Sequence, residues 1–373
     1  MITVQNINSA ECLATSRVII NDNFTFLQDT YSSVKNVASI AQHNVSNVIE
    51  KNINFVNELQ ELIPSSFNDI YVSLSKTNSN INCMSNSIYI HPYNGTFIYL
   101  FSAKYNTWLC RDIYKDFKPL EFTLQDRFNV KLKKETNYDI YLSWNDNNDK
   151  FEIDFIEWSN SNVGTNLNYT YNYTLGVPTL KTDKTKRYIG CIRTTLEGTT
   201  EQNHGGTDID GVHPKVFLYN HSNRRKRIIS NTITGTYTPS RLFTANRDLN
   251  DSWFRTSHSN ETQMNNSKFS FILGEPTYIE MRYCNTFYSE NLATVFSSIG
   301  LNTTNTISKN LNTNCIKGVK TCKGTGSTFS TFTGVLQRGF YFLQTFDAAT
   351  NNVTFNKNFD ETQKTGFISV IES

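Results

Sequence analysis

The sequence has no long hydrophobic run, little charge and no paired cysteine motif. No stretch approaches the roughly 18 consecutive apolar residues of a membrane-spanning helix, so we expect a chain that is not embedded in a membrane. The 35 basic and 33 acidic residues leave a formal charge of +2. Nucleic-acid-coating proteins normally carry a basic surplus, so we expect no nucleic-acid partner. The seven cysteines are dispersed, which is typical of reduced thiols in a chain made in a reducing cytoplasm.

Sequence motifs for catalysis and for metal or phosphate binding are also missing. There is no Gly-x-Ser-x-Gly, no His-Glu-x-x-His and no Walker sequence. His204, His213 and His221 fall in one polar region, but surface-loop histidines explain them better than metal ligands do. Glu152 and Asp154 alternate with the apolar face of one strand, so we expect them to face solvent rather than act as paired glycosidase carboxylates. The sequence predicts a non-enzymatic protein without a cofactor or a metal.

Most of the chain carries the pattern of β-structure. Charged residues make up only 18% and aromatic residues reach 13%, a balance that favours β-rich folds. Residues 138–158 alternate apolar and polar side chains on both sides of an Asn- and Asp-rich turn, which predicts a β-hairpin. No helical pattern separates the strands, so we expect an antiparallel β-sandwich rather than a parallel α/β sheet. Further strands are predicted at 97–101, 186–193, 215–220, 268–273, 277–283, 339–346 and 366–371.

The first sixty residues show a helical pattern in place of the strand alternation. Residues 10–63 contain neither Pro nor Gly, and Pro64 ends the pattern. Between these limits apolar positions recur in alternating steps of four and three through six heptads, which predicts a coiled coil roughly 63 Å long. The predicted seam consists of Ile20, Phe24, Leu27, Tyr31, Val34, Ala38, Ala41, Val45, Val48, Asn52, Phe55, Leu59 and Leu62.

The composition of this segment indicates that its seam is shared between chains. Its other faces are rich in Asn, Ser and Asp, which are weak helix formers, so an isolated helix would be unstable. Asn52 is the one polar seam position, and a single buried Asn commonly fixes register and oligomer state. Large side chains at both ends favour a trimer over a dimer. A long helix packed on its own domain remains the alternative. We expect a stalk at 1–64, a small β-rich domain at 65–136 and a C-terminal β-sandwich at 137–373.

Two features are candidates for surface binding. Arg224, Arg225, Lys226 and Arg227 form the only dense basic cluster, which could contact an anionic glycan, a phosphate or an acidic neighbour. A solvated strand end is the more common explanation of such a run. Trp253 lies in a polar segment and is the tryptophan best suited to exposed stacking on a sugar ring.

Several segments together resemble a β-rich domain of tailed-phage virion proteins, often called tail fibre or structural proteins. The strongest segment is Lys186–Thr195, and the resemblance is collinear over roughly residues 85–371. Cys191 departs from the usual Thr or Ser, and the insertion 202–212 looks long. The other segments are Ser87–Gly95 with Tyr105–Trp108, Asn137–Leu142 with the Trp158 strand, Lys215–Arg224, Ser298–Thr304 and Gly339–Gln344.

The resemblance implies a homotrimeric appendage on a phage particle, made in the bacterial cytoplasm and located on the virion. Its partners would be its own copies, other virion proteins of the capsid or of the tail and neck, and a host cell-surface glycan. The sequence leaves two alternatives open. One is a capsid-decorating head fibre or cement protein, and the other, less favoured, is a tailspike that depolymerises glycan.

Overall fold

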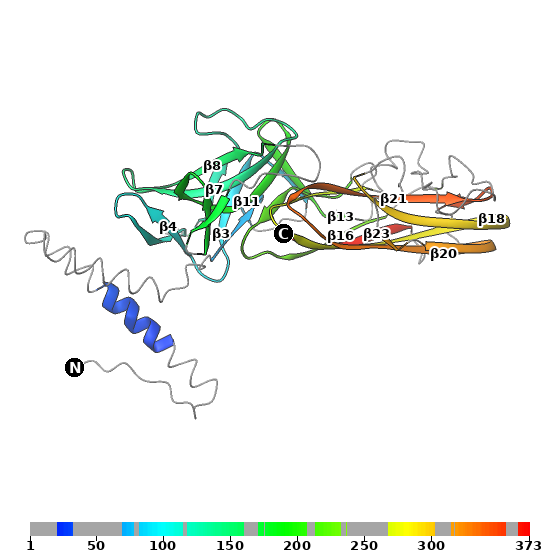
Figure 1. The fold of residues 1–373 in the computed structure, drawn as a ribbon, viewed down its shortest axis with the longest axis horizontal. Helices are drawn as coiled ribbons and strands as arrows, with labels where there is room; N and C mark the ends of the chain where they lie inside the picture. The colour runs from blue at the N-terminus through cyan, green and yellow to red at the C-terminus, as the bar shows by residue number, and fades with distance from the viewer. Residues whose placement is uncertain are drawn as a thin grey trace, which may run out of the picture. The chain divides into compact units, whose positions relative to one another are not determined.

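The computed structural model divides the chain into two compact units, Met1–Pro64 and Ser65–Ser373, which are taken in turn. In the first unit residues 21–32 are α-helical (Figure 1). The second unit is built of β-strands. The structure describes residues 21–32, 69–77, 82–114, 118–159, 171–174, 176–206, 213–232, 236, 268–302, 315–316, 318–355 and 365–373.

The helix of the first unit carries three of the predicted seam residues on its surface. Phe24, Leu27 and Tyr31 are 63%, 54% and 62% exposed in the single chain. Several hydroxyls bond back to the carbonyl four residues earlier, as Thr25 does to Asn21 at 3.0 Å, so these polar side chains are partly satisfied within the helix. No coiled-coil stalk is shown by the described residues, and the trimer stays a prediction. The remaining seam positions, Ile20, Val34, Ala38, Ala41, Val45, Val48, Asn52, Phe55, Leu59 and Leu62, lie outside the described residues.

The second unit begins with small antiparallel sheets around one core. Its central hairpin joins β7 (Asn137–Asn145) to β8 (Lys150–Glu157), as the alternating pattern predicts. Asp149 adopts the left-handed region at φ 58° in the connecting turn. The neighbouring strands are β1 (Ile70–Ser73), β2 (Asn82–Ser85), β3 (Ser87–Pro92), β4 (Phe97–Ser102), β5 (Thr107–Asp112), β6 (Leu120–Thr123), β9 (Tyr171–Thr174), β10 (Val177–Leu180), β11 (Asp183–Leu196), β12 (Thr199–Asn203) and β15 (Leu218–Asn220).

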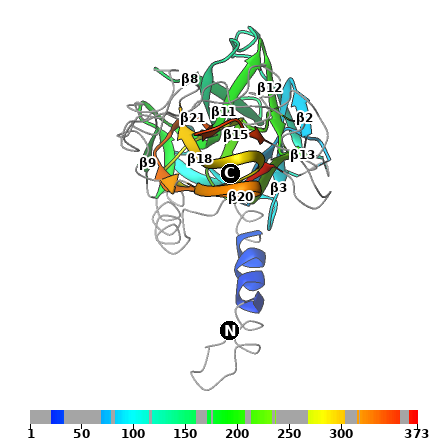
Figure 2. The ribbon, with the colours of Figure 1, turned by 90° about the vertical axis from the view of Figure 1, so that its right-hand side faces the viewer.

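The C-terminal half of the unit is dominated by two long strands. β18 (Thr277–Leu301) and β20 (Gly318–Leu336) pair antiparallel and lie side by side in both ribbon views (Figures 1 and 2). The other strands of the large sheet here are β13 (Gly205–Gly206), β14 (Lys215–Val216), β16 (Lys226–Thr232), β17 (Lys268–Leu273), β19 (Cys315–Ile316), β21 (Gly339–Ala349), β22 (Thr354–Phe355) and β23 (Gly366–Glu372).

The register between β18 and β20 shifts within the strand pair. Ser289 pairs with Gly324 and Ala293 pairs with Cys322, so three residues of β18 are left between two successive pairs. On one side of the shift β18 pairs with β23, and on the other side it pairs with β21. Gly324 has φ +91°, a conformation that glycine adopts without a steric penalty. β18 therefore connects β23 and β21 within the sheet.

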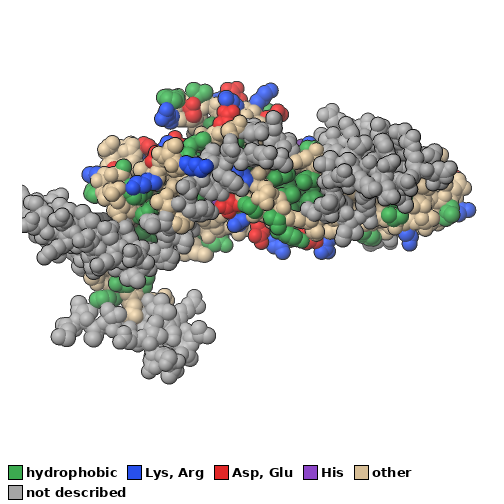
Figure 3. Space-filling view, viewed as in Figure 1, with side chains coloured by type: hydrophobic (Ala, Val, Ile, Leu, Met, Phe, Trp, Pro, Cys, Tyr) green, Lys and Arg blue, Asp and Glu red, His purple; other side chains and the backbone are tan. Residues whose placement is uncertain are grey.

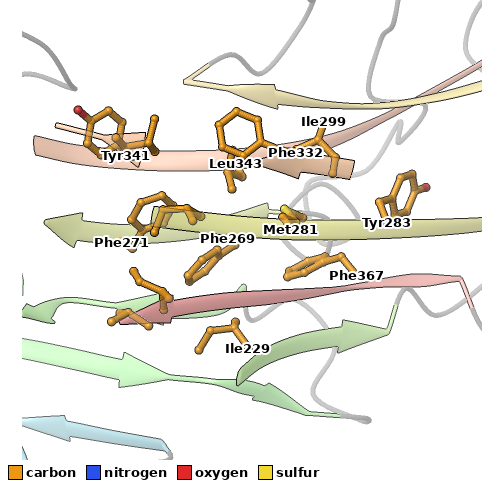
Figure 4. Close-up of a cluster of buried hydrophobic side chains, with 14 of the residues drawn as sticks. Ile229, Phe269, Phe271, Met281, Tyr283, Ile299, Phe332, Tyr341, Leu343 and Phe367 are labelled. Atoms are coloured by element: carbon orange, nitrogen blue, oxygen red, sulfur yellow. The ribbon is translucent and has the colours of Figure 1, made fainter. Parts of the chain in front are cut away.

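A large hydrophobic core packs against one side of these strands. Met281 and Tyr283 from β18, Phe332 from β20 and Phe367 from β23 are at most 5% exposed. Figure 4 shows these side chains pointing into the same interior as Phe269 and Phe271 of β17. Strand alternation is the cause, because every second residue of a strand faces the same side. The core therefore takes up alternate hydrophobic residues of the predicted strands at 268–273, 277–283 and 339–346, whereas Phe340 and Phe342 lie on the other side of β21 and Tyr278 is 55% exposed.

The mainly β prediction is confirmed, with two differences. β13–β16 and β14–β17 pair in parallel, so the sheet is mixed rather than purely antiparallel. Some strands lie outside the predicted ranges, among them β12 and β13. β20 was not predicted either. The N-terminal half of this strand is rich in Gly, Ser and Thr and does not alternate apolar with polar residues.

A buried ion pair joins β7 to the β20–β21 connection. Arg338 Nη2 donates to both carboxylate oxygens of Asp139 at 2.7 and 2.8 Å, and the two side chains are 1% and 0% exposed. Trp158 Nε1 donates to the same carboxylate at 2.8 Å, and the Arg338 guanidinium lies 4.3 Å from the Trp158 ring. Burial disfavours the charge of Arg338, but the field of Asp139 and their hydrogen bonds outweigh it and raise the pKa of Arg338. The pair fixes the distance between the two halves of the unit.

Replacing Arg338 by Met should lower the free energy of unfolding by about 3–5 kcal/mol, because Asp139 would be left buried without a counter-charge. Adding Asp139→Asn should recover part of the loss, since the amide oxygen still accepts from Trp158. Urea unfolding followed by circular dichroism measures both variants. Arg282→Met is the control, because Arg282 pairs with Glu280 on the surface and its side chain is 70% exposed. Equal effects of Arg338→Met and Arg282→Met would contradict the role of the buried pair.

Candidate functional site

The predicted basic cluster does not form one surface. Lys226 is exposed on β16, whereas Arg227 is 9% exposed and donates from Nε to Ser373 Oγ at 2.7 Å. Burial lowers the pKa of Arg227 to about 10, with a further contribution from Arg225. Arg224 donates to the Tyr219 hydroxyl at 2.8 Å and lies 3.7 Å from Glu275. The alternation of β16 thus turns neighbouring cations to opposite sides.

Arg225 has a structural contact with the last residue. Its backbone exchanges hydrogen bonds with Ser373 at 3.0 and 3.1 Å. Its guanidinium lies 4.2 Å from the centre of the Tyr71 ring and 5.4 Å from that of Tyr93. Two of the four predicted surface cations therefore hold β16, β23 and β1 together. Trp253, the other surface-binding candidate, lies outside the described residues.

The three histidines are separate and partly buried, not exposed on surface loops. His204 approaches Gln202 at 3.0 Å, and His221 Nδ1 lies 2.8 Å from Glu275 Oε1. Burial, aided by the fields of Lys215 and Lys268, lowers the pKa of His213 to about 3. Within the ranges that the structure describes, no three His, Cys, Asp or Glu residues are grouped as metal ligands.

The carboxylates on β8 form hydrogen bonds or ion pairs with neighbouring side chains. Glu152 accepts from Asn145 Nδ2 at 2.6 Å, and Asp154 pairs with Lys186 at 3.0 Å. Glu157 pairs with Lys133 at 2.7 Å on an exposed face. Surface pairs of this kind contribute little to stability. Glu152 faces solvent, as the alternating pattern predicts, whereas Asp154 is only partly exposed beside Lys186.

A shallow depression of about 470 Å³ lies beside β2 and β3. Its lining offers hydroxyl groups and one ammonium group, which suit hydrogen bonding to a polar ligand. Burial raises the pKa of the Cys83 thiol, so this sulfur is a poor nucleophile there. The lining includes Ser75, Lys76, Cys83, Ser85, Tyr89 and Thr199.

A polar cluster that sequence reasoning missed surrounds Glu275. Its carboxylate approaches His221 and Arg224, and Arg224 in turn donates to Tyr219. Burial raises the pKa of Tyr219 above its usual value. The residues come from the segment 219–224 and from the β17–β18 connection, so no local sequence signal links them. Their mutual contacts make this cluster a structural junction.

Charge on the visible face is mixed. Among the described residues in the space-filling view, basic and acidic side chains are interspersed without a large patch of one sign (Figure 3). The helical residues that the structure describes do not have the length and hydrophobicity needed to cross a membrane.

Comparison with known proteins gives no family. A scan against protein-family models and a search of curated proteins found no match. Among solved structures the chain aligns with a Bacillus thuringiensis Cry1Da tryptic core variant at 9% identity and a TM-score of 0.18, covering 81% of this chain and 50% of that one. The mosquito-larvicidal Cry4Aa toxin from Bacillus thuringiensis aligns at 8% sequence identity and a TM-score of 0.17, covering 82% of this chain and 52% of that one.

A structure of infectious bursal disease virus, Gx strain, aligns at 9% identity and a TM-score of 0.15, covering 81% of this chain and 70% of that one. The chain spans about half the length of the two toxin structures. TM-scores this low carry no argument about fold or function.

The partly buried His213 predicts a loss of stability in mild acid. Because its pKa is lowered in the folded state, the unfolded chain binds more protons below about pH 6.5, the ordinary histidine value. The free energy of unfolding should therefore fall as the pH drops from 6.5 to 4, by up to about 1.4 kcal/mol per pH unit from this group. Urea unfolding of wild type and His213→Gln across this range measures the slope, which should be shallower in the variant. Lys226→Gln is the matched control, and an unchanged slope in His213→Gln would contradict the assignment.

Proposed function

We propose that the chain is a non-enzymatic structural appendage protein of a tailed-phage virion. It assembles as a homotrimer through its N-terminal heptads and attaches to the host surface through its β-rich second unit. The observation that carries the proposal is the apolar stripe of the helix, where Phe24, Leu27 and Tyr31 are exposed in the single chain.

The physical argument is that this helix needs a partner. Isolated helices of this length are marginal in water, and the weak helix formers in the segment make it less stable still. Burying one large apolar side chain contributes about 1.5–3 kcal/mol. Three such side chains at steps of three and four lie on one face, where a second and third copy would cover them.

The proposed mechanism of attachment is avidity. Three second units on one axis convert weak single contacts into firm binding, because the second and third contacts become intramolecular. The proposed partners are copies of the same chain, capsid or tail and neck proteins, and a host cell-surface glycan. The mixed surface charge supports many modest contacts over one strong electrostatic site.

Leu27→Asp should convert the trimer to monomers, because each chain would place a charge in the apolar seam. Gln28→Asp is the matched control, since Gln28 is exposed beside Leu27 and the same residue is introduced. Multi-angle light scattering measures the mass of each variant. A trimeric Leu27→Asp protein, or a wild type that is monomeric at all concentrations, would contradict the proposal.

Location on the particle tests the virion assignment itself. Gold-labelled antibody against the second unit should decorate phage particles in electron micrographs, at the tail for a host-attachment fibre. Label confined to the head would favour the capsid-decorating alternative. Particles without label, in a preparation where the antibody recognises the purified protein, would refute the virion role.

A further inference from the structure

One face of the second unit gathers cations from separate parts of the chain. Lys215 on β14 and Lys268 on β17 lie on the same side of a parallel strand pair, because Lys215 is in register with Ser270. Phe340 and Phe342 of β21 lie on this side too, opposite Ile272 and Ser270. Arg193 of β11 reaches the same face, with its guanidinium 3.9 Å from the centre of the Phe340 ring.

Aromatic rings hold two of these cations in place. The Lys268 ammonium lies 4.3 Å from the centre of the Phe342 ring, which parallels the Arg193–Phe340 contact. Phe217 supports Phe340 edge-on at 5.9 Å between ring centres. Arg193 Nη1 also donates to Asn137 Oδ1 at 2.9 Å. Cation–π contacts of this kind orient a charge and leave its outward hydrogen-bond donors available.

Positive charge on this face exceeds negative charge. Lys215 pairs with Glu201, and Glu135 acts on Arg193 from a distance. Lys268 is partly buried and has no acidic partner among the described residues. Its pKa is lowered by burial and then by Lys215 and Arg193. A partly buried charge surrounded by like charges is unfavourable unless an anion compensates it.

We propose that Arg193, Lys215 and Lys268 form a binding site for an oxyanion group, a carboxylate or a phosphate, carried by a polar ligand. The guanidinium supplies a planar fork of donors and the two ammonium groups supply point charges, a combination that suits both kinds of oxyanion. The aromatic floor of Phe340 and Phe342 keeps the cations apart and partly dehydrated, which strengthens their attraction for an anion. The site is independent of the helix and of the proposed trimer.

Isothermal titration calorimetry at constant ionic strength tests the site with three probes. Tripolyphosphate carries phosphate groups, trigalacturonate carries carboxylates, and maltotriose is a neutral control. Wild type should bind at least one of the two anions and should not bind maltotriose. The anion that binds identifies the chemical source of the oxyanion.

Lys268→Met should weaken anion binding at least tenfold, because it removes the unpaired charge and keeps an apolar side chain of similar length. Without anion this variant should unfold at a higher urea concentration than wild type, since an uncompensated charge is lost. Lys226→Met, on exposed β16, is the matched control and should bind like wild type. Arg193→Gln is a second site variant with the same expected loss of binding.

The proposal would be overturned by wild type that binds neither anion, or by equal affinity in Lys268→Met, Arg193→Gln and wild type. It would also be overturned if Lys226→Met lost as much affinity as Lys268→Met, because the attraction would then reflect overall charge. The urea midpoints keep the two site variants interpretable, since they show whether each protein is folded at the titration conditions.

Discussion

The second unit depends on one buried charge pair, Asp139 with Arg338. Asp139 lies on the face of β7 opposite Tyr138 and Ile140, which belong to the core of the first half. Arg338 lies between Leu336 and Tyr341, which belong to the core of the second half. A buried charge without its partner costs several kcal/mol, so the β20–β21 connection has one acceptable position against β7. This requirement connects the two cores, and Trp158 contacts both members of the ion pair.

How much of the fold could be predicted from the sequence depends on how far apart in the sequence the interacting residues lie. Hairpin 138–158 was predictable because its pattern and its turn are local, and the strands of the core were predictable because they alternate apolar and polar residues. β20 was not, since Gly, Ser and Thr give little periodic signal in its N-terminal half. Asp139 and Arg338 are 199 residues apart in sequence, and no pattern near either residue announces the other.

The candidate sites divide in the same way. The heptad stripe is a local pattern, and Phe24, Leu27 and Tyr31 do share an exposed face of the helix. The basic run 224–227 is also local, but strand alternation and contacts with Ser373 and Tyr71 use part of it for packing. The cationic face of Arg193, Lys215 and Lys268 has no local signature. It exists only because β11, β14, β17 and β21 are brought together by the sheet.

The position of β23 has a consequence for synthesis of the chain. β23 lies between β16 and the first part of β18, so residues 366–372 join two strands that were translated earlier. The hydrogen bond from Arg227 to Ser373 can form only after the 146 residues that separate them in sequence have been synthesised. Until residues 366–373 leave the ribosome, the edges of β16 and β18 that pair with β23 stay open to solvent and to other nascent chains. Rapid translation of the codons for residues 302–373, or a chaperone that shields these flanks, would therefore improve the yield of folded protein.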